Sequence, residues 1–292
     1  MSSPYHALKD AGDVMYVEVQ MGTQWIKHKD GIAWEESGQL HRAGLCHGVT
    51  GRTGGVSPAP YHSLNLALHV GDSVSCVLEN RRRLCAHLGC RLDVLTTPQQ
   101  THEDHVIAVG DSEIGRGAGS YHDAFPHTDA LMTSRPGVLL LICIADCVPV
   151  ILYDPVKKAC AVIHDGWRGT ASRLASKTVF AMQTVYGSQP RDILAFIGPS
   201  ISREHFEVSE ATSDIFRHMG PAYDQCVYKT ADTVCVDLWQ ANQQLLLHAG
   251  LLPQHIDTTT HCAYQDEQAF YSYRRDGGHT GRMAAFAMIP AI

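Results

Sequence analysis

Val138-Leu-Leu-Leu-Ile-Cys-Ile-Ala-Asp-Cys-Val-Pro-Val-Ile-Leu-Tyr153 is the stretch of sequence that indicates the fold most directly. Residues 138–144 and 148–153 are continuous apolar runs, which are typical of strands covered on both faces. The dipeptide Asp154-Pro155 predicts a turn, and residues 159–163 predict a third apolar strand after it. Because these strands follow one another closely, we expect them to form a sheet at the centre of the molecule.

The remainder of the chain mixes helices with further strands. Apolar residues at helical spacing, in series closed by a glycine, predict three helices. These helices span residues 74–89, 170–186 and 237–249, and further strands span residues 193–197 and 283–289. Since the helices and strands do not alternate regularly, we predict an α+β fold: a single layered domain with mixed β-sheets flanked by helices.

The first part of the chain has a weaker pattern. Residues 16–20 and 32–34 are candidates for short edge strands. The composition of the sequence changes from Cys46 onward, where Gly-rich segments typical of loops begin. We therefore expect an N-terminal extension, residues 1–45, followed by one main domain, residues 46–292.

The amino-acid composition indicates a folded protein and argues against some classes of binding partner. Of 292 residues, 45% are hydrophobic and 18% charged, which predicts a folded protein with a sizeable core. Lys and Arg number 23 against 30 Asp and Glu, and the net charge of −7 argues against general binding of nucleic acids or anionic membranes. A small anion held by a local group of arginines remains compatible with this charge. No basic and apolar leader is visible, so we expect a cytoplasmic protein.

Histidine and cysteine are frequent, with 18 and 10 residues. The cysteines are irregularly spaced without a CxxC pair, so free thiols are expected. Cys147 follows an apolar strand, His164 ends another, and His102 lies in Gln100-Thr-His-Glu103. One cysteine and two histidines suit a transition metal, with zinc first, and leave an open position as catalytic zinc sites do. A cysteine and a histidine equally suit a nucleophile and its base.

Arginines in glycine-bounded turns form a second group: Arg52, Arg168, Arg274 and Arg275. A guanidinium near a helix start or turn is a natural partner for phosphate, although each arginine can also cap its own turn. The sequence has no Walker loop, GxGxxG, GxSxG or HExxH motif, which argues against an NTPase, a Rossmann dehydrogenase, an esterase and a zincin. The HxE…PCxxC signature of deaminases is also absent.

Taken together, these motifs resemble the YfiH-type laccase-domain family. Its members carry the older name multicopper polyphenol oxidase and are now assigned as purine nucleoside phosphorylases. The similar segments run in the family's order from about residue 46 to residue 289. They are Gly51-Arg-Thr-Gly-Gly-Val-Ser57, Ser63-Leu-Asn-Leu66, His69-Val-Gly-Asp72, Glu79-Asn-Arg-Arg-Arg83, Thr128-Asp-Ala130, Ala145-Asp-Cys-Val-Pro149, His164-Asp-Gly-Trp-Arg-Gly169, Ile197-Gly-Pro199 and Tyr271-Ser-Tyr-Arg-Arg-Asp276.

The resemblance implies an enzyme. By it, residues 46–292 would be a zinc-dependent purine nucleoside phosphorylase acting on adenosine, inosine and methylthioadenosine, with adenosine deaminase as a side activity. The family's zinc ligands fall on His102, Cys147 and His164. The implied fold is α+β and is related to Cys–His hydrolase folds.

The substrates implied are a purine nucleoside and phosphate. Some of Arg52, Arg168, Arg274 and Arg275 would hold the phosphate. Asn65 is a candidate contact to the sugar or the base, or else caps the turn after Ser63. Asp146 is a candidate for moving a proton beside Cys147.

Two other enzymatic functions stay open, as does a non-enzymatic metal-binding or scaffold role. A copper-dependent polyphenol oxidase (laccase) needs a Cys and two His for one copper and a further cluster of histidines, and no HxH pair occurs. A Cys–His hydrolase editing a cell-wall (peptidoglycan) precursor would use Cys147 as its nucleophile. The family pattern is also altered by Glu103 and Asp165, carboxylates next to two implied ligands, which either orient the imidazoles or point elsewhere.

Overall fold

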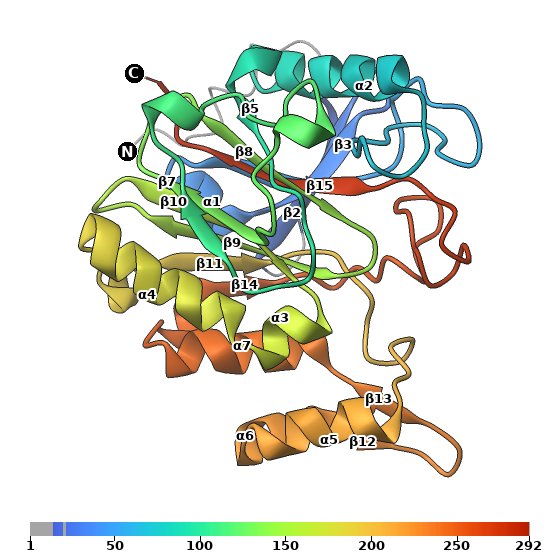
Figure 1. Ribbon diagram of the computed structural model, residues 1–292, viewed down its shortest axis with the longest axis vertical. Helices are drawn as coiled ribbons and strands as arrows, with labels where there is room; N and C mark the ends of the chain where they lie inside the picture. Colours follow the sequence, from blue (N-terminus) through green and yellow to red (C-terminus); the bar gives the residue numbers. More distant parts are fainter. Residues whose placement is uncertain (1–13, 20–21, 292) are drawn as a thin grey trace.

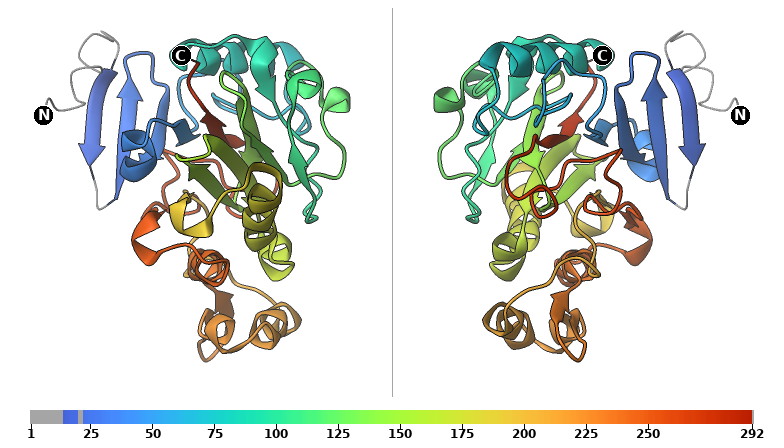
Figure 2. Two further views of the ribbon diagram at one scale, coloured as in Figure 1. Left: turned by 90° about the vertical axis from the view of Figure 1, so that its left-hand side faces the viewer. Right: turned by 90° about the vertical axis from the view of Figure 1, so that its right-hand side faces the viewer.

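The computed structural model describes residues 14–19 and 22–291. Two β-sheets pack face to face and helices cover their outer faces, so that four layers follow one another (Figure 1 and Figure 2). Helix α2 (Val74–His87) lies over the seven-stranded sheet, and α4 (Leu174–Tyr186) and α7 (Leu238–His248) cover the six-stranded sheet. Both sheets contain parallel and antiparallel pairs. The predicted α+β class with mixed sheets is confirmed.

The seven-stranded sheet combines the N-terminal strands with strands from the middle and the end of the chain. Its strands, in spatial order, are β1 (Val14–Val19), β2 (Thr23–His28), β3 (Ala33–Ser37), β4 (Cys46–Thr50), β15 (Met283–Met288), β8 (Leu139–Ile144) and β5 (Leu95–Thr96). β1 lies at an edge, whereas β3 lies between β2 and β4 rather than at an edge. β3 is interior because its Trp34 is a core residue that packs with Phe286 of β15.

The six-stranded sheet carries the rest of the central strands. In spatial order these are β14 (Ile256–Thr258), β11 (Leu194–Ile197), β9 (Val148–Asp154), β10 (Ala159–Asp165), β7 (Ala130–Thr133) and β6 (Val106–Ala108). β9 and β10 form a hairpin whose turn is closed by Asp154, because its Oδ1 accepts the backbone N–H groups of Val156 and Lys157.

The expectation of one sheet for the three apolar strands is wrong. β8 belongs to the seven-stranded sheet, while β9 and β10 belong to the six-stranded sheet. The chain leaves one sheet and enters the other across residues 145–147, which are Ala, Asp and Cys. A continuous apolar run indicates that a strand is buried on both faces, but it does not specify which strand lies beside it.

The alternation of side chains along β8 shows how both faces are buried. Leu140 and Ile142 point into the core between the two sheets, whereas Leu139 and Leu141 belong to the cluster that includes residues of α2. Every residue of β8, β9 and β10 is buried. These strands therefore form a rigid frame for whatever lies at their ends.

Of the three predicted helices, α2 and α7 begin and end close to the predicted positions, and the third does not. The helices not yet named are α1 (Gly38–Arg42), α3 (Trp167–Ala171), α5 (Glu210–His218) and α6 (Pro221–Asp224). The helix predicted over residues 170–186 is in fact two helices, α3 and α4, because the chain turns at Arg173, whose φ is 65°. None of the described helices is long and apolar enough to cross a lipid bilayer.

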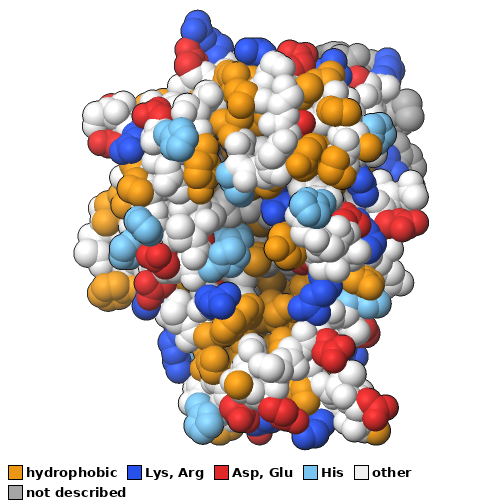
Figure 3. Space-filling model, turned by 45° about the vertical axis from the view of Figure 1, so that its right-hand side comes forward, with side chains coloured by type: hydrophobic (Ala, Val, Ile, Leu, Met, Phe, Trp, Pro, Cys, Tyr) orange, Lys and Arg blue, Asp and Glu red, His pale blue; other side chains and the backbone are white. Residues whose placement is uncertain are grey.

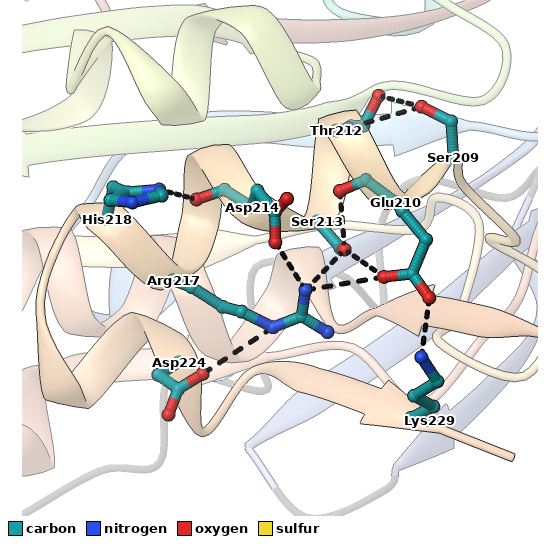
Figure 4. A network of polar contacts seen from close by, with 9 residues as sticks. All are labelled: Ser209, Glu210, Thr212, Ser213, Asp214, Arg217, His218, Asp224 and Lys229. Atoms are coloured by element: carbon teal, nitrogen blue, oxygen red, sulfur yellow. Dashed lines mark hydrogen bonds and ion pairs between the residues drawn. The ribbon is translucent and has the colours of Figure 1, made fainter.

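A small outer unit, residues 210–236, precedes α7 in the chain and lies on its outer side, and no helix or strand was predicted there. It consists of α5, α6 and the hairpin β12 (Val227–Lys229) and β13 (Val234–Val236) (Figure 1). Arg217 joins its parts by contacts with Glu210, Asp214 and Asp224, and Lys229 of β12 also pairs with Glu210 (Figure 4). Exposed ion pairs contribute little stability, about 0–1 kcal/mol each, so this unit depends on its apolar contacts with α7.

Candidate functional site

The crossing between the two sheets places Cys147 beside His164. In the β9–β10 hairpin, His164 pairs with Pro149 and Asp165 with Val148, so the end of β10 lies next to the start of β9. Cys147 immediately precedes β9 and therefore stands at the same end of the sheet as His164. This proximity follows directly from the antiparallel register of the hairpin.

His102 reaches the same place from a loop held by Asp129. The buried Asp129 carboxylate accepts the backbone N–H groups of Thr101 (3.2 Å), His102 (3.1 Å) and Glu103 (2.8 Å). It also contacts Nδ1 of His164 at 2.7 Å. His102 has φ 62°, which is uncommon for a residue with a side chain, and the three hydrogen bonds to Asp129 maintain it. One carboxylate thus positions both histidines.

His102, Cys147 and His164 can offer ligand atoms that all lie within 4.8 Å of one another. The two imidazole rings are 4.9 Å apart between centroids. Gly166 provides the space for the thiol, because a Cβ at this position would lie 2.6 Å from Cys147 Sγ. The group could hold a metal ion, and the Asp129 contact leaves Nε2 of His164 for the ion.

The charges within this group stabilise a thiolate. Burial by itself raises the pKa of Cys147, but His164 and His102 outweigh that effect and lower the pKa to about 6. Burial lowers the pKa of His164, whereas Cys147 and Asp129 raise it, to about 10. Both pKa shifts therefore favour a thiolate paired with an imidazolium. A thiolate is the form of cysteine that binds metals and attacks electrophiles.

The three carboxylates singled out in the sequence differ in position. Asp146 lines the cavity, where Oδ2 accepts the Arg274 backbone N–H at 2.8 Å and Oδ1 has no hydrogen-bond partner among the described residues. Burial raises the pKa of Asp146. Asp165 lies against α3, since a Cβ at Gly169 would be 2.5 Å from its Oδ1. Glu103 turns outward and pairs with His127. Neither Asp165 nor Glu103 is bonded to a candidate ligand's imidazole.

The group lies in a cavity of about 480 Å³. Figure 3 shows a hollow near the middle of one face, where histidine and basic side chains border apolar ones. The lining combines titratable groups with aromatic rings and two arginines. Its members are His69, Gln100, His102, Cys143, Ala145, Asp146, Cys147, His164, Gly166, Trp167, Ile201, Phe206, Leu238, Tyr273, Arg274 and Arg282.

Of the four arginines predicted to hold phosphate, only Arg274 lines this cavity. Arg52 and Arg275 border a different cavity. Arg52 donates to the carbonyls of residues 62 and 267, and Arg275 uses all three guanidinium nitrogens on carbonyls and on Asp276. Arg168 is exposed and stacks on Trp167, with Cζ 4.3 Å from the ring centroid. A phosphate-binding role for Arg52 and Arg275 stays a prediction, although both guanidinium groups already donate to loops of the chain itself.

Asn65 is fully buried and does not line the cavity. Its Nδ2 donates to Ala67 and Asp72, and its Oδ1 accepts the backbone N–H groups of Ala67 and Arg282. The structure therefore gives Asn65 the turn-holding role that the sequence had left as its alternative. Its contact with Arg282 connects it to the cavity wall.

Several residues of the site have no assigned role in the sequence analysis. Asp129 lies in Thr128-Asp-Ala130, one of the segments similar to the family, and this similarity could have identified it as a site residue. Gln100 fixes the loop by exchanging two hydrogen bonds with the Cys143 backbone, at 2.6 and 2.7 Å. No sequence motif marked Phe206 or Arg282 as a site residue, because both line the cavity from segments that are distant in the sequence from the candidate ligands.

The chain is similar to known proteins over most of its length. Residues 46–290 match the family described as multi-copper polyphenol oxidoreductase laccase. Purine nucleoside phosphorylase YlmD of Bacillus subtilis is 36% identical over 254 residues, covering 87% of this chain and 91% of the relative. A purine nucleoside phosphorylase of Deinococcus radiodurans is 38% identical over 244 residues, covering 84% and 89%.

Two solved structures are similar over nearly the whole chain. The crystal structure of YlmD from Geobacillus stearothermophilus has a TM-score of 0.84 at 34% identity and covers 96% of this chain and 100% of its own. The crystal structure of the Bacillus licheniformis hypothetical protein YfiH has a TM-score of 0.84 at 33% identity, covering 94% and 98%.

Proposed function

This chain belongs to the multi-copper polyphenol oxidoreductase laccase family, and on that premise we propose that it is a purine nucleoside phosphorylase. Its substrates are adenosine, inosine and methylthioadenosine together with phosphate, and adenosine deamination is a second activity. Relatives named purine nucleoside phosphorylase, 29–38% identical to this chain, support the proposal. We place the catalytic domain at residues 46–292, with residues 1–45 as an N-terminal extension.

The observation that carries the proposal is the His102–Cys147–His164 group on the wall of a cavity of nucleoside size. A cavity of about 480 Å³ falls in the range of small-molecule sites, about 300–1,000 Å³. Trp167, Phe206 and Tyr273 line it with aromatic rings, which suit a planar purine. Asp146, whose Oδ1 accepts no hydrogen bond from the part of the chain that the structure describes, is the group we propose to exchange a proton with the substrate.

We propose zinc as the bound metal, with copper as the alternative. Two imidazoles and a thiolate fit zinc and leave a position open. When bound, zinc would supply a Lewis acid in the cavity. Within residues 14–19 and 22–291 no second group of His, Cys, Asp or Glu with comparable spacing accompanies this one, whereas a multicopper oxidase needs a further histidine cluster.

The test is chromatography of purified, zinc-loaded protein incubated with adenosine, with and without phosphate. Adenine and ribose 1-phosphate formed only with phosphate would support phosphorolysis, and inosine in either sample would support deamination. Unchanged adenosine in both samples, with zinc verified by elemental analysis, would refute the proposal.

The structure offers one specific reason to keep a Cys–His hydrolase as the second candidate. Cys147, His164 and Asp129 follow one another as nucleophile, base and orienting carboxylate, with His164 Nδ1 2.7 Å from Asp129 Oδ1. If the protein is a Cys–His hydrolase, the substrate class that we propose for it is a peptidoglycan precursor. Replacing Cys147 by Ser separates the two candidates: loss of zinc identifies a ligand, whereas loss of precursor hydrolysis by metal-free protein identifies a nucleophile.

A further inference from the structure

Arg282 is a second cation in the wall of the cavity, and nothing above gives it a role. It directly precedes β15, the strand between β4 and β8 in the seven-stranded sheet. Its side chain is half-buried and lines the same cavity as the His102–Cys147–His164 group. Across the described part of the chain, no carboxylate oxygen lies within 4.0 Å of its guanidinium, so it forms no ion pair there.

Among the described residues, the Arg282 guanidinium donates hydrogen bonds through Nη1 alone, to the carbonyls of Thr280 (2.8 Å) and Gly281 (3.0 Å). Its Cζ also lies 5.5 Å from the centroid of the Tyr273 ring. Arg275, by contrast, uses Nε, Nη1 and Nη2 within its own loops. A guanidinium that lines a cavity with Nε and Nη2 unused and no ion pair to a described carboxylate is suited to a tetrahedral anion, which accepts two parallel hydrogen bonds.

The backbone of Arg282 is held firmly on both sides. Its N–H donates to Oδ1 of the buried Asn65 at 3.0 Å, and its carbonyl accepts the N–H of Leu66 at 3.2 Å. The next residue begins a buried central strand. The guanidinium therefore starts from a fixed anchor, which reduces the entropy lost when a ligand binds.

A neutral histidine completes the local environment. His69 lines the same cavity, and partial burial together with the charges of Arg282 and Arg81 lowers its pKa to about 4. At neutral pH its imidazole therefore carries one N–H donor and no charge. Arg282 supplies the positive charge for an anion, and His69 can add a hydrogen bond.

We propose that Arg282, assisted by His69, holds the inorganic phosphate that takes part in nucleoside cleavage. The inference rests on the proposed function and adds to Arg274 a binding residue that the motifs did not suggest. In the reaction a phosphate oxygen forms a bond to C1′ as the C1′–N9 bond breaks. The electron pair of the broken bond goes to the purine, which takes up the proton released by hydrogen phosphate, so the atoms and charges balance.

The first test measures phosphate binding without turnover. Inorganic phosphate is titrated with zinc-loaded protein and followed by broadening of its ³¹P resonance. Wild type is compared with R282Q, R282K and R191Q; R191Q removes an equal charge from an exposed side chain near Asp192. Loss of a charge-assisted, two-point contact predicts binding about tenfold to hundredfold weaker in R282Q, an intermediate value in R282K and no change in R191Q.

The second test uses the proposed phosphorylase activity. R282Q should raise the KM for phosphate in adenosine phosphorolysis by the same factor, whereas R191Q should leave that KM unchanged. If thermal unfolding shows that R282Q is unstable, the KM for phosphate is measured with R282K instead. Lysine keeps the positive charge but lacks the planar guanidinium that can donate two parallel hydrogen bonds.

The outcomes are distinct. Phosphate binding to R282Q within twofold of wild type, or no phosphate binding by wild type, overturns the inference. So does weaker binding of adenosine 5′-monophosphate by R282Q with inorganic phosphate unaffected, since that would assign the residue to a nucleotide phosphate. If wild type cleaves no nucleoside but R282Q still loses phosphate, the proposed function fails and the phosphate site stands.

Discussion

Asp129→Asn is the substitution that examines the organisation of the candidate metal centre most directly. Oδ1 of Asp129 serves His164 Nδ1 and the His102 N–H, while Oδ2 serves the N–H groups of Thr101 and Glu103. An asparagine keeps only one acceptor oxygen, and its NH₂ group faces donors in either orientation. Two of the four hydrogen bonds are therefore lost whichever way the amide turns.

The size of the effect follows from that count. Losing two hydrogen bonds to a buried charge at about 1–3 kcal/mol each lowers the free energy of unfolding by about 2–6 kcal/mol. Because a neutral amide neither orients His164 nor favours its partly positive ring, zinc affinity should fall about 10- to 100-fold. If the loop that carries His102 also leaves its present conformation, in which His102 has φ 62°, zinc affinity should fall further than this.

The assay is competition for zinc against a chromophoric chelator, run with urea unfolding of the metal-free protein. Asp257→Asn is the matched control, since Asp257 is a buried carboxylate away from the cavity that accepts Ser37 Oγ (2.6 Å) and Gln39 Nε2 (2.7 Å). The control should lose stability but keep its zinc affinity. Zinc affinity of D129N within twofold of wild type would refute the positioning role.

Three further substitutions test other parts of the structure. Gly166→Ala places a Cβ 2.6 Å from Cys147 Sγ, so bound zinc by elemental analysis should fall well below one per chain while α3 stays folded by circular dichroism. Asn65→Ala removes the amide that holds the Arg282 N–H, and urea unfolding should show a loss of about 2–3 kcal/mol, with a raised phosphate KM. His47 is buried between the Ser37 N–H (2.9 Å) and the Leu45 carbonyl (3.0 Å), and burial lowers its pKa. Its stabilising contribution is therefore full above the unfolded pKa of about 6.5 and is lost as pH falls, by at most about 1.4 kcal/mol per pH unit; the same slope in His47→Gln would contradict this.

Local patterns in the sequence were sufficient for most elements. The helices at α2 and α7, and the strands β9, β10, β11 and β15, lie within a few residues of the predicted ranges. These segments were predictable because hydrophobic period and terminal glycine or proline act over a few residues. The types of the three candidate ligands were also evident, once the ordered motifs were compared with the family.

The break after α3 was less predictable. Arg173 adopts φ 65° although it is not glycine, so no residue type marked the turn between α3 and α4. The outer unit was missed for a related reason: its elements are short, and only their contacts with α7 and with one another make them stable.

What the sequence determined by itself is therefore the inventory: α+β, buried strands, Cys147 and His164 at the ends of apolar runs, and His102 in a polar segment. The tertiary structure decided the arrangement. It separated β8 from β9 into two sheets, placed Asp129 between two histidines, and put Arg274 and Arg282, but not Arg52 and Arg275, in the wall of the cavity. The physical reason is that burial and turn formation are encoded locally, whereas the partner of a charged side chain depends on which distant backbone groups the fold brings to it.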